Sequence, residues 1–219
     1  MLPEKRSNLT ARLTFEEQQL ALGYHHIVGI DEAGRGTWAG PVVAGAVCLP
    51  LERDDLLTML RGVRDSKQMT PLQRLRLAGT IRNVARAWAV GSASSAEVDQ
   101  VGIVGATRLA MRRALDAMEL KPDFLLLDGF RWEEMPIPQQ HLIKGDSLSL
   151  SIAAASILAK VWRDAYMTDL DALYPQYAFG THKGYGTAAH QRALQTYGPT
   201  PEHRMSFKPL LTLQTAGQP

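Results

Sequence analysis

The sequence predicts an α/β fold, in which a β-sheet is flanked by helices. Short apolar runs of strand type alternate along the chain with longer segments whose apolar residues recur at helical spacing. The run Phe124–Leu127 is apolar throughout, which favours a strand buried on both faces. The 219 residues, 45% of them hydrophobic, are enough for one full core. Alternating strands and helices are typical of a sheet covered by helices.

The first half of the chain contains three expected strands and two long expected helices. A glycine-rich turn and Pro41 separate the first two strands. Thr70-Pro71 is typical of a helix start, because a threonine cap precedes a proline at the first helical position. The expected elements are a short helix at 14–22 within a polar arm (residues 1–24), strands at 27–30, 42–49 and 87–92, and helices at 71–85 and 106–118.

The second half contains two short expected strands and two expected helices. The strand Phe124–Leu127 ends at Asp128-Gly129, and a strand at Leu142-Ile143 ends just before Asp146. Small residues near the start of the helix at 152–173 allow close packing against a sheet. A short helix at 190–197 ends at Gly198-Pro199. We expect residues 25–213 to form a single domain and residues 214–219 to be a frayed tail.

Composition places the chain in an ordinary class of globular protein. The net charge of +2 is too small to imply a polyanionic partner, although residues 182–208 are locally basic. Cys48 is the single cysteine, so an internal disulfide is excluded and a reducing compartment is favoured. There is no apolar run of the length of a membrane span and no segment resembling a signal peptide. We therefore expect a cytoplasmic protein with no membrane partner, and a monomer by default.

Acidic residues follow two of the expected strands. Asp31 and Glu32 come directly after the strand at 27–30, and Asp128 follows Phe124–Leu127. Sites in open α/β sheets form at the carboxyl ends of strands, so Asp31 and Asp128 meet if their strands are parallel neighbours. Asp146 can complete a cluster of four carboxylates. Because adjacent strand residues face opposite ways, Glu32 joins the cluster only if the chain turns there.

Such a cluster predicts a metal site. Neighbouring carboxylates repel each other unless a cation lies between them, and oxygen ligands without zinc-type spacing favour Mg²⁺ or Mn²⁺. Two ions about 3.5–4 Å apart can activate a water and stabilise the leaving oxygen of a phosphodiester. The alternative for Asp128-Gly129 taken alone is ordinary turn chemistry.

Glycines on both sides of Arg35 allow the backbone to come close to a ligand. Gly34, Gly36 and Ala39 also match a loose dinucleotide-binding pattern. That pattern requires a helix directly after the turn, to receive the pyrophosphate. Here Pro41 and a strand-type run follow instead, so a dinucleotide enzyme is a distant alternative.

Lys183-Gly184-Tyr185-Gly186 places an aromatic ring between glycines in the basic segment. Stacking on a base or sugar is one interpretation, and a buried tyrosine in a glycine-rich turn is the other. His182, His190 and His203 lack close ligand spacing, so we expect phosphate contacts or ordinary surface residues there. Asp164 is expected to pair with Lys160 one helical turn away rather than to join the acidic site.

Taken together, these residues resemble the bacterial ribonuclease HII family over residues 27–208. The shared motifs are Asp31-Glu32-Ala33-Gly34-Arg35-Gly36, Gly40-Pro41-Val42, Asp65-Ser66-Lys67, Leu127-Asp128-Gly129, Lys144-Gly145-Asp146, Ala153-Ala154-Ala155-Ser156-Ile157, Ala159-Lys160, Arg163-Asp164, His182-Lys183-Gly184-Tyr185-Gly186-Thr187 and Pro201-Glu202-His203-Arg204-Met205-Ser206-Phe207. Thr37-Trp38 departs from the smaller or proline-containing variants that the family leads us to expect. The arm before Tyr24 matches no motif of the family.

The resemblance implies an RNase H-like fold, with a mixed central sheet, flanking helices and a helical C-terminal part. It implies a two-metal endonuclease that cleaves the RNA strand of RNA–DNA hybrids and incises duplex DNA at embedded ribonucleotides, leaving 3′-hydroxyl and 5′-phosphate ends. A role in DNA repair follows from that activity. A non-catalytic nucleic acid-binding module whose acids are structural is the alternative.

The resemblance also assigns roles to single residues. By position, Asp31, Glu32, Asp128 and Asp146 correspond to metal ligands and catalytic residues. The segment Gly34-Arg35-Gly36 corresponds to the part that reads the 2′-hydroxyl at the RNA–DNA junction, and Tyr185 to the ring that stacks on the sugar beyond it. Lys67, Lys183 and Arg204 are expected to contact the substrate, the last two through its phosphates.

Overall fold

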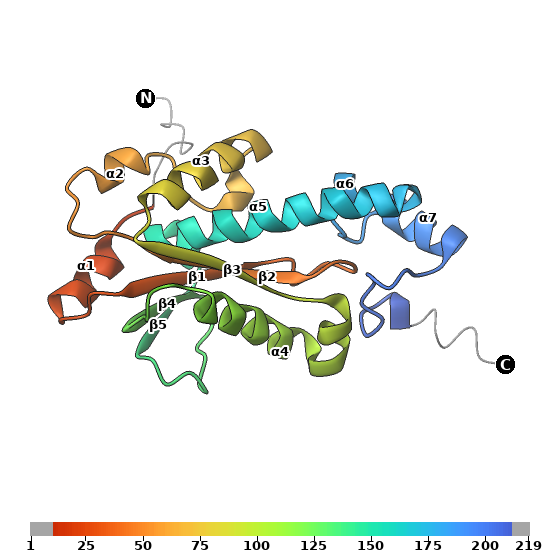
Figure 1. Cartoon of the computed structure of the whole chain (residues 1–219). Coiled ribbons are helices and arrows are strands. Elements are labelled where there is room, and N and C mark those ends of the chain that lie inside the picture. Colours follow the sequence, from red (N-terminus) through yellow and green to blue (C-terminus); the bar gives the residue numbers. More distant parts are fainter. Residues whose placement is uncertain (1–10, 212–219) are drawn as a thin grey trace, which may run out of the picture.

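A computed structural model describes residues 11–211 as a five-stranded sheet between two layers of helices (Figure 1). Along the sheet the strands lie in the order β3-β2-β1-β4-β5. Strand β2 is antiparallel to β1 and β3, whereas β4 is parallel to both β1 and β5. The mixed sheet confirms the predicted fold class. The strands are β1 (Ile27–Ala33), β2 (Val42–Cys48), β3 (Ala87–Ala93), β4 (Phe124–Asp128) and β5 (Gln139–Leu142).

The two long helices cover opposite faces of the sheet. Helix α4 (Ser95–Asp116) packs on one face and α5 (Leu150–Leu173) on the other, where α3 (Pro71–Val84) lies over α5 (Figure 1). The short helices α6 (Phe179–His182) and α7 (Ala188–Tyr197) follow α5 and form the helical C-terminal part. The remaining short elements are α1 (Thr14–Ala21), α2 (Leu56–Met59) and the 3₁₀ turns η1 (Ser66–Gln68), η2 (Gly145–Ser147) and η3 (Pro175–Tyr177).

Local sequence signals set the helix starts and the sheet-to-helix distance. Thr70 caps α3 before Pro71, as the sequence predicts, and Gln73 completes a reciprocal capping box with it. A Cβ at Gly29 would lie 2.2 Å from the carbonyl carbon of Ser151, and one at Gly45 would lie 2.3 Å from the Ala155 oxygen. Glycine in the strands therefore lets α5 approach the sheet at van der Waals distance, next to its alanine-rich first turns.

The predicted helix near residues 14–22 is confirmed as α1, and it carries a buried acid. The Glu16 Oε1 atom accepts hydrogen bonds from both the Ser149 and Ser151 hydroxyls and from the Ser151 N–H. These donors belong to the cap and first turn of α5, where helix amides need acceptors. Glu16 therefore fastens α1 to the start of α5.

Some predicted boundaries are wrong. Strand β5 covers Gln139–Leu142 instead of the predicted Leu142-Ile143, and Asp146 lies in η2 rather than at a strand end. Helix α4 starts at Ser95 and continues through a kink at Gly102 (φ 72°), whereas the sequence predicted a helix only from residue 106. The expected tail at 214–219 lies outside the described residues. None of the helices in residues 11–211 is both long and apolar enough to cross a membrane.

Candidate active site

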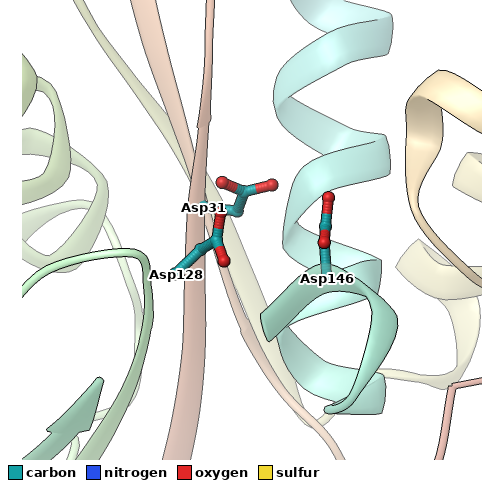
Figure 2. A group of neighbouring side chains, drawn as sticks. All are labelled: Asp31, Asp128 and Asp146. Atoms are coloured by element: carbon teal, nitrogen blue, oxygen red, sulfur yellow. The ribbon is translucent and has the colours of Figure 1, made fainter. Parts of the chain in front are cut away.

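The predicted acidic cluster forms at the carboxyl ends of β1 and β4. These strands are parallel neighbours, with Ile30 paired to Leu127, which places Asp31 beside Asp128. Carboxylate oxygens of Asp31, Asp128 and Asp146 all lie within 4.8 Å of one another. Figure 2 shows the three side chains, from β1, β4 and η2, gathered beside α5. The prediction that distant acids meet at one sheet edge is therefore confirmed for these three.

A tight turn after β5 brings Asp146 to the cluster. Lys144 adopts a left-handed conformation (φ 59°), and the Gly145 N–H donates a 2.6 Å hydrogen bond to Asp128 Oδ1. A Cβ at Gly145 would lie 2.7 Å from Ile152 Cδ1, so a larger residue in this turn would displace the Ile152 side chain. The Lys144-Gly145 pair thus determines where Asp146 lies.

Burial and mutual repulsion make the cluster electrostatically strained. Burial raises the pKa of Asp31 well above its usual value, and the Glu32 and Asp128 charges raise it further. Burial likewise raises the pKa of Asp146 to about 6, helped by the Asp65 and Asp128 charges and opposed by Lys67. Among the described residues the buried Asp31 Oδ2 atom has no hydrogen-bond partner. An oxygen-only donor set with an unsatisfied buried oxygen fits a hard divalent cation.

Glu32 lies next to the cluster rather than within it. The chain does not turn at Glu32, which continues the regular strand opposite Ala44. Its Cβ therefore leaves β1 on the face opposite to that of Asp31, and only the far end of its side chain comes near the cluster. Its Oε1 atom is 3.3 Å from the Arg35 guanidinium, while its buried Oε2 atom has no hydrogen-bond partner within residues 11–211. Burial raises the pKa of Glu32, and the Asp128 charge adds to this rise. The Glu32 carboxylate is thus close enough to the cluster for the Asp128 charge to change its pKa.

Lys67 is the cation at the rim of the cluster. Its Nζ atom is 3.6 Å from Asp146 Oδ2, and its side chain is 71% exposed. Turn η1, which carries Lys67, is capped by Asp65 and is tied to α5 by a 2.8 Å hydrogen bond between Ser66 and Ser156. Lys67 therefore extends into solvent from a fixed base beside the acids.

The glycine segment, Gly34-Arg35-Gly36, directly follows β1, and the chain after it contacts the segment that carries Tyr185. Gly34 has a positive φ of 92°, and a Cβ added at Gly36 would meet no atom within 4 Å. The segment leads into strand β2 instead of a helix, which rules out the dinucleotide interpretation. Tyr185 is 45% exposed, so the alternative of a buried tyrosine is wrong. Trp38 links the two segments, because its backbone N–H donates to the Gly184 carbonyl at 2.9 Å.

Arg204 occupies a different position from the one expected of a phosphate contact. The side chain is fully buried, and its guanidinium donates to the carbonyl oxygens of Gly40 and Arg35. Burial, followed by the neighbouring Arg163 charge, lowers the pKa of Arg204 to about 9. This placement does not fit a contact with substrate phosphates. Arg204 instead fixes the backbone of the glycine segment through its hydrogen bond to the Arg35 carbonyl.

The three histidines are buried, so the expectation of surface or phosphate-contact residues is wrong. The Nε2 atoms of His190 and His203 are 2.9 Å apart, and the His182 ring stacks on His190 at 4.5 Å. His190 Nδ1 lies 2.9 Å from the Tyr185 carbonyl oxygen. Burial lowers the pKa of both His190 and His203 to about 4. These neutral rings hold the backbone beneath Tyr185.

Asp164, Lys183 and Arg163 make polar contacts next to the site. Asp164 pairs with Lys160 at 2.7 Å and with Arg74 at 3.2 Å, which confirms the predicted pairing. Lys183 is partly buried, and its ammonium donates to the Asp164 carbonyl and to the Thr168 hydroxyl. Arg163, to which the sequence assigned no role, is fully buried between the glycine segment and Lys183.

Known proteins match the whole of this architecture. The family model for Ribonuclease HII matches residues 28–210. Ribonuclease HII of Roseiflexus castenholzii is 53% identical over 205 residues, which cover 93% of this chain and 92% of that protein. Ribonuclease HII of Chloroflexus aggregans is 50% identical over 201 residues, covering 92% and 95% of the two chains. The crystal structure of ribonuclease H2 from Pyrococcus horikoshii superposes with a TM-score of 0.71 at 25% identity, covering 87% of this chain and 97% of that one.

Proposed function

The chain belongs to the ribonuclease HII family, and from this premise we propose its substrates and site chemistry. Family membership makes it an RNase H-type endoribonuclease. Its proposed substrates are the RNA strand of RNA–DNA hybrids and duplex DNA with embedded ribonucleotides, cut on the 5′ side of the ribonucleotide. The products would carry 3′-hydroxyl and 5′-phosphate ends, which suits a role in removing ribonucleotides from DNA.

The acidic cluster is the observation that carries this proposal. Asp31, Asp128 and Asp146 would hold two divalent ions, Mg²⁺ or Mn²⁺, with Glu32 supplying a ligand from the adjacent position. When bound, such ions activate a water and stabilise the leaving oxygen of a phosphodiester. The protein itself fixes the oxygens: β1 and β4 set Asp31 and Asp128, and the Gly145 N–H orients Asp128.

Residues beside the cluster are suited to reading the substrate. Within Gly34-Arg35-Gly36 the backbone is open at Gly36, where a Cβ would meet no atom within 4 Å, and a backbone group at close range can contact the 2′-hydroxyl that distinguishes RNA from DNA. The half-exposed Tyr185 ring is available for stacking on a sugar. Lys67 is exposed at the rim and would neutralise a substrate phosphate. Lys183 would do so from the edge of the Tyr185 segment.

A cleavage assay on duplex DNA with one ribonucleotide tests the proposal. With Mg²⁺ or Mn²⁺ we expect a single incision 5′ to the ribonucleotide, and none with a chelator or on the matched all-DNA duplex. Binding of this substrate without incision would instead favour a non-catalytic nucleic acid-binding module whose acids are structural.

The working state of the enzyme is a further part of the proposal. We infer that it acts as a monomer in the cytoplasm, where its free and buried thiol Cys48 is compatible with reducing conditions. Light scattering of the protein on its substrate checks the first point, with a mass of two chains per duplex as the contrary result.

A further inference from the structure

Arg163 joins the two segments that are proposed to read the substrate. Its Nε donates to the Pro41 carbonyl at 2.9 Å, and Nη2 donates to the Ala39 carbonyl at 3.1 Å and to the Thr37 hydroxyl at 2.9 Å. On the other side, Nη1 donates to the Lys183 carbonyl at 2.9 Å. One side chain of α5 therefore holds both the chain that directly follows Gly34–Gly36 and the chain that leads into Tyr185.

Glycines allow the first segment to pack on Arg163 and the second segment to pack on the chain that Arg163 holds. A Cβ at Gly34 would lie 2.1 Å from Arg163 Nε, and one at Gly184 would lie 2.4 Å from the Ala39 oxygen. Both glycines also have positive φ angles, 92° and 79°. Thr37 extends the contact, because its hydroxyl lies 3.0 Å from the Gly34 carbonyl that it can donate to. The guanidinium is thus built into the fold of the reading segments.

The same helix also contacts the metal centre. Ser156 lies seven residues before Arg163, which is two helical turns or about 10 Å along the same face. Its hydroxyl opposes the rise that burial causes in the pKa of Asp31. The same hydroxyl is hydrogen-bonded to Ser66, in the turn that carries Lys67. Helix α5 therefore contacts both the acidic cluster, through Ser156, and the two reading segments, through Arg163.

A fully buried arginine is costly to retain unless its hydrogen bonds are needed. Arg163 is completely buried, and its hydrogen bonds within the described chain go to carbonyl and hydroxyl oxygens rather than to a carboxylate. Such an arrangement gives little net stabilisation but fixes the positions of four acceptors. Positional accuracy is what a nuclease needs in order to cut one bond beside the group it recognises.

We propose that Arg163 is a positioning residue that sets the distance between the metal centre and the Gly34–Gly36 and Tyr185 segments, and thereby determines which phosphodiester bond is cut. This inference rests on the proposed function. It separates two properties of the enzyme: the acids determine whether a bond is cut, and Arg163 determines which one.

Arg163→Lys tests the inference, because lysine keeps the charge but has no fork of donors to span both segments. On duplex DNA with one ribonucleotide we expect kcat to fall about 100-fold, as a displacement of about 1 Å can cause, with a smaller change in KM. We also expect incisions at neighbouring bonds, mapped on a denaturing gel. Calorimetric titration with Mn²⁺ should give wild-type binding, because the acids are untouched.

Two further variants separate positioning from general stability. Thr37→Val removes one acceptor of Arg163 with little change in volume and should blur the cleavage site in the same way, whereas Thr37→Ser should restore it. Met111→Ala is the matched control, since Met111 is a buried residue of α4, which packs on the opposite face of the sheet. It should lower stability while leaving the cleavage site unchanged.

The outcomes distinguish this inference from the proposed function. If folded Arg163→Lys or, should that variant not fold, Thr37→Val cuts only the wild-type bond, the positioning role is refuted. Blurred cleavage in Met111→Ala would also refute it, because site choice would then follow stability. If wild-type protein does not incise the substrate at all, it is the proposed function that fails.

Discussion

The two ends of the site along α5 treat buried polar groups differently: the metal-centre end, around Asp31 and Ser156, leaves some of them without partners among the described residues, and the reading end, around Arg163 and Tyr185, pairs them. At the metal-centre end, Asp31 and Glu32 each keep a buried oxygen with no hydrogen-bond partner in the described chain. At the reading end, the buried Arg163 and Arg204 side chains donate to backbone carbonyls and, from Arg163, to the Thr37 hydroxyl. The buried histidines there are likewise paired with each other and with the backbone.

This difference separates the chemistry from the scaffold. Unsatisfied buried carboxylates raise the free energy of the metal-free fold and create an affinity for cations. Satisfied buried cations leave nothing for a ligand to neutralise, so they stiffen the surrounding backbone. A polar residue in the active-site region therefore indicates ligand binding only where its hydrogen-bonding capacity is left over.

Asp128→Asn breaks the comparison at its acidic end and has the largest expected effect. The amide keeps an oxygen for the Gly145 N–H but removes one charge from the cluster. We expect turnover to fall by at least about 1,000-fold, since metal-ion stabilisation is worth several kcal/mol. The metal-free protein should become more stable to urea, because repulsion with Asp31 is relieved.

Single-turnover cleavage and urea unfolding in chelator measure the two effects of Asp128→Asn. Asp169→Asn is the control, because Asp169 is an exposed carboxylate further along α5; both quantities should stay at wild-type values. Near-normal turnover of Asp128→Asn would remove Asp128 from the metal site.

The pH dependence of stability sharpens the comparison at the other end. His190 and His203 have pKa values lowered to about 4 by burial, whereas the unfolded chain binds these protons near pH 6.5. Their contribution is therefore complete above pH 6.5 and is lost as the pH falls toward 4, by at most about 3 kcal/mol per histidine. Asp31 and Asp146 act in the opposite direction, because their raised pKa values favour the protonated fold.

His203→Gln isolates the histidine contribution, because the acids cancel when the variant is compared with wild type. Between pH 7 and pH 5 the variant should lose about 2 kcal/mol less unfolding free energy than wild type. Urea titrations at the two pH values measure this difference. Leu194→Ala creates a cavity in the hydrophobic cluster whose Tyr177 and Phe179 rings contact His203. This variant should be destabilised equally at both pH values. An identical pH dependence for His203→Gln and wild type would mean that these rings titrate normally.

Local signals explain what the sequence could predict. The apolar runs of β1 and β4 and the Thr70-Pro71 cap are each encoded by neighbouring residues, and the structure confirms them. The meeting of Asp31 with Asp128 followed from one topological assumption, that their strands are parallel neighbours. Strand β5 was misplaced because its residues Gln139, Gln140 and His141 are polar, as an edge strand allows, and so give no apolar run.

Tertiary burial of polar residues explains what the sequence could not predict. Arg204 and the histidines lie in segments rich in charge and glycine, whose pattern resembles an exposed basic face. Arg163 did leave a signal. Ala159, Arg163 and Met167 follow one another at four-residue spacing on the buried face of α5, and an arginine within such an apolar stripe indicates a buried guanidinium. The position of Asp146 depends on the turn at Lys144-Gly145, which no periodicity reveals.

Tyr185→Ala has the smallest expected effect and tests an exposed aromatic ring at the reading end. The backbone of Tyr185 is fixed, because its N–H donates to the His182 carbonyl and its own carbonyl faces His190, while the ring is 45% exposed. Removing the ring should lower kcat/KM at a single ribonucleotide about tenfold, the value of one stacking contact, and leave the urea midpoint unchanged. Tyr185→Phe keeps the stacking face and should retain activity. Equal cleavage by all three proteins would mean that the ring, although left free by a fully bonded backbone, does not contact the substrate.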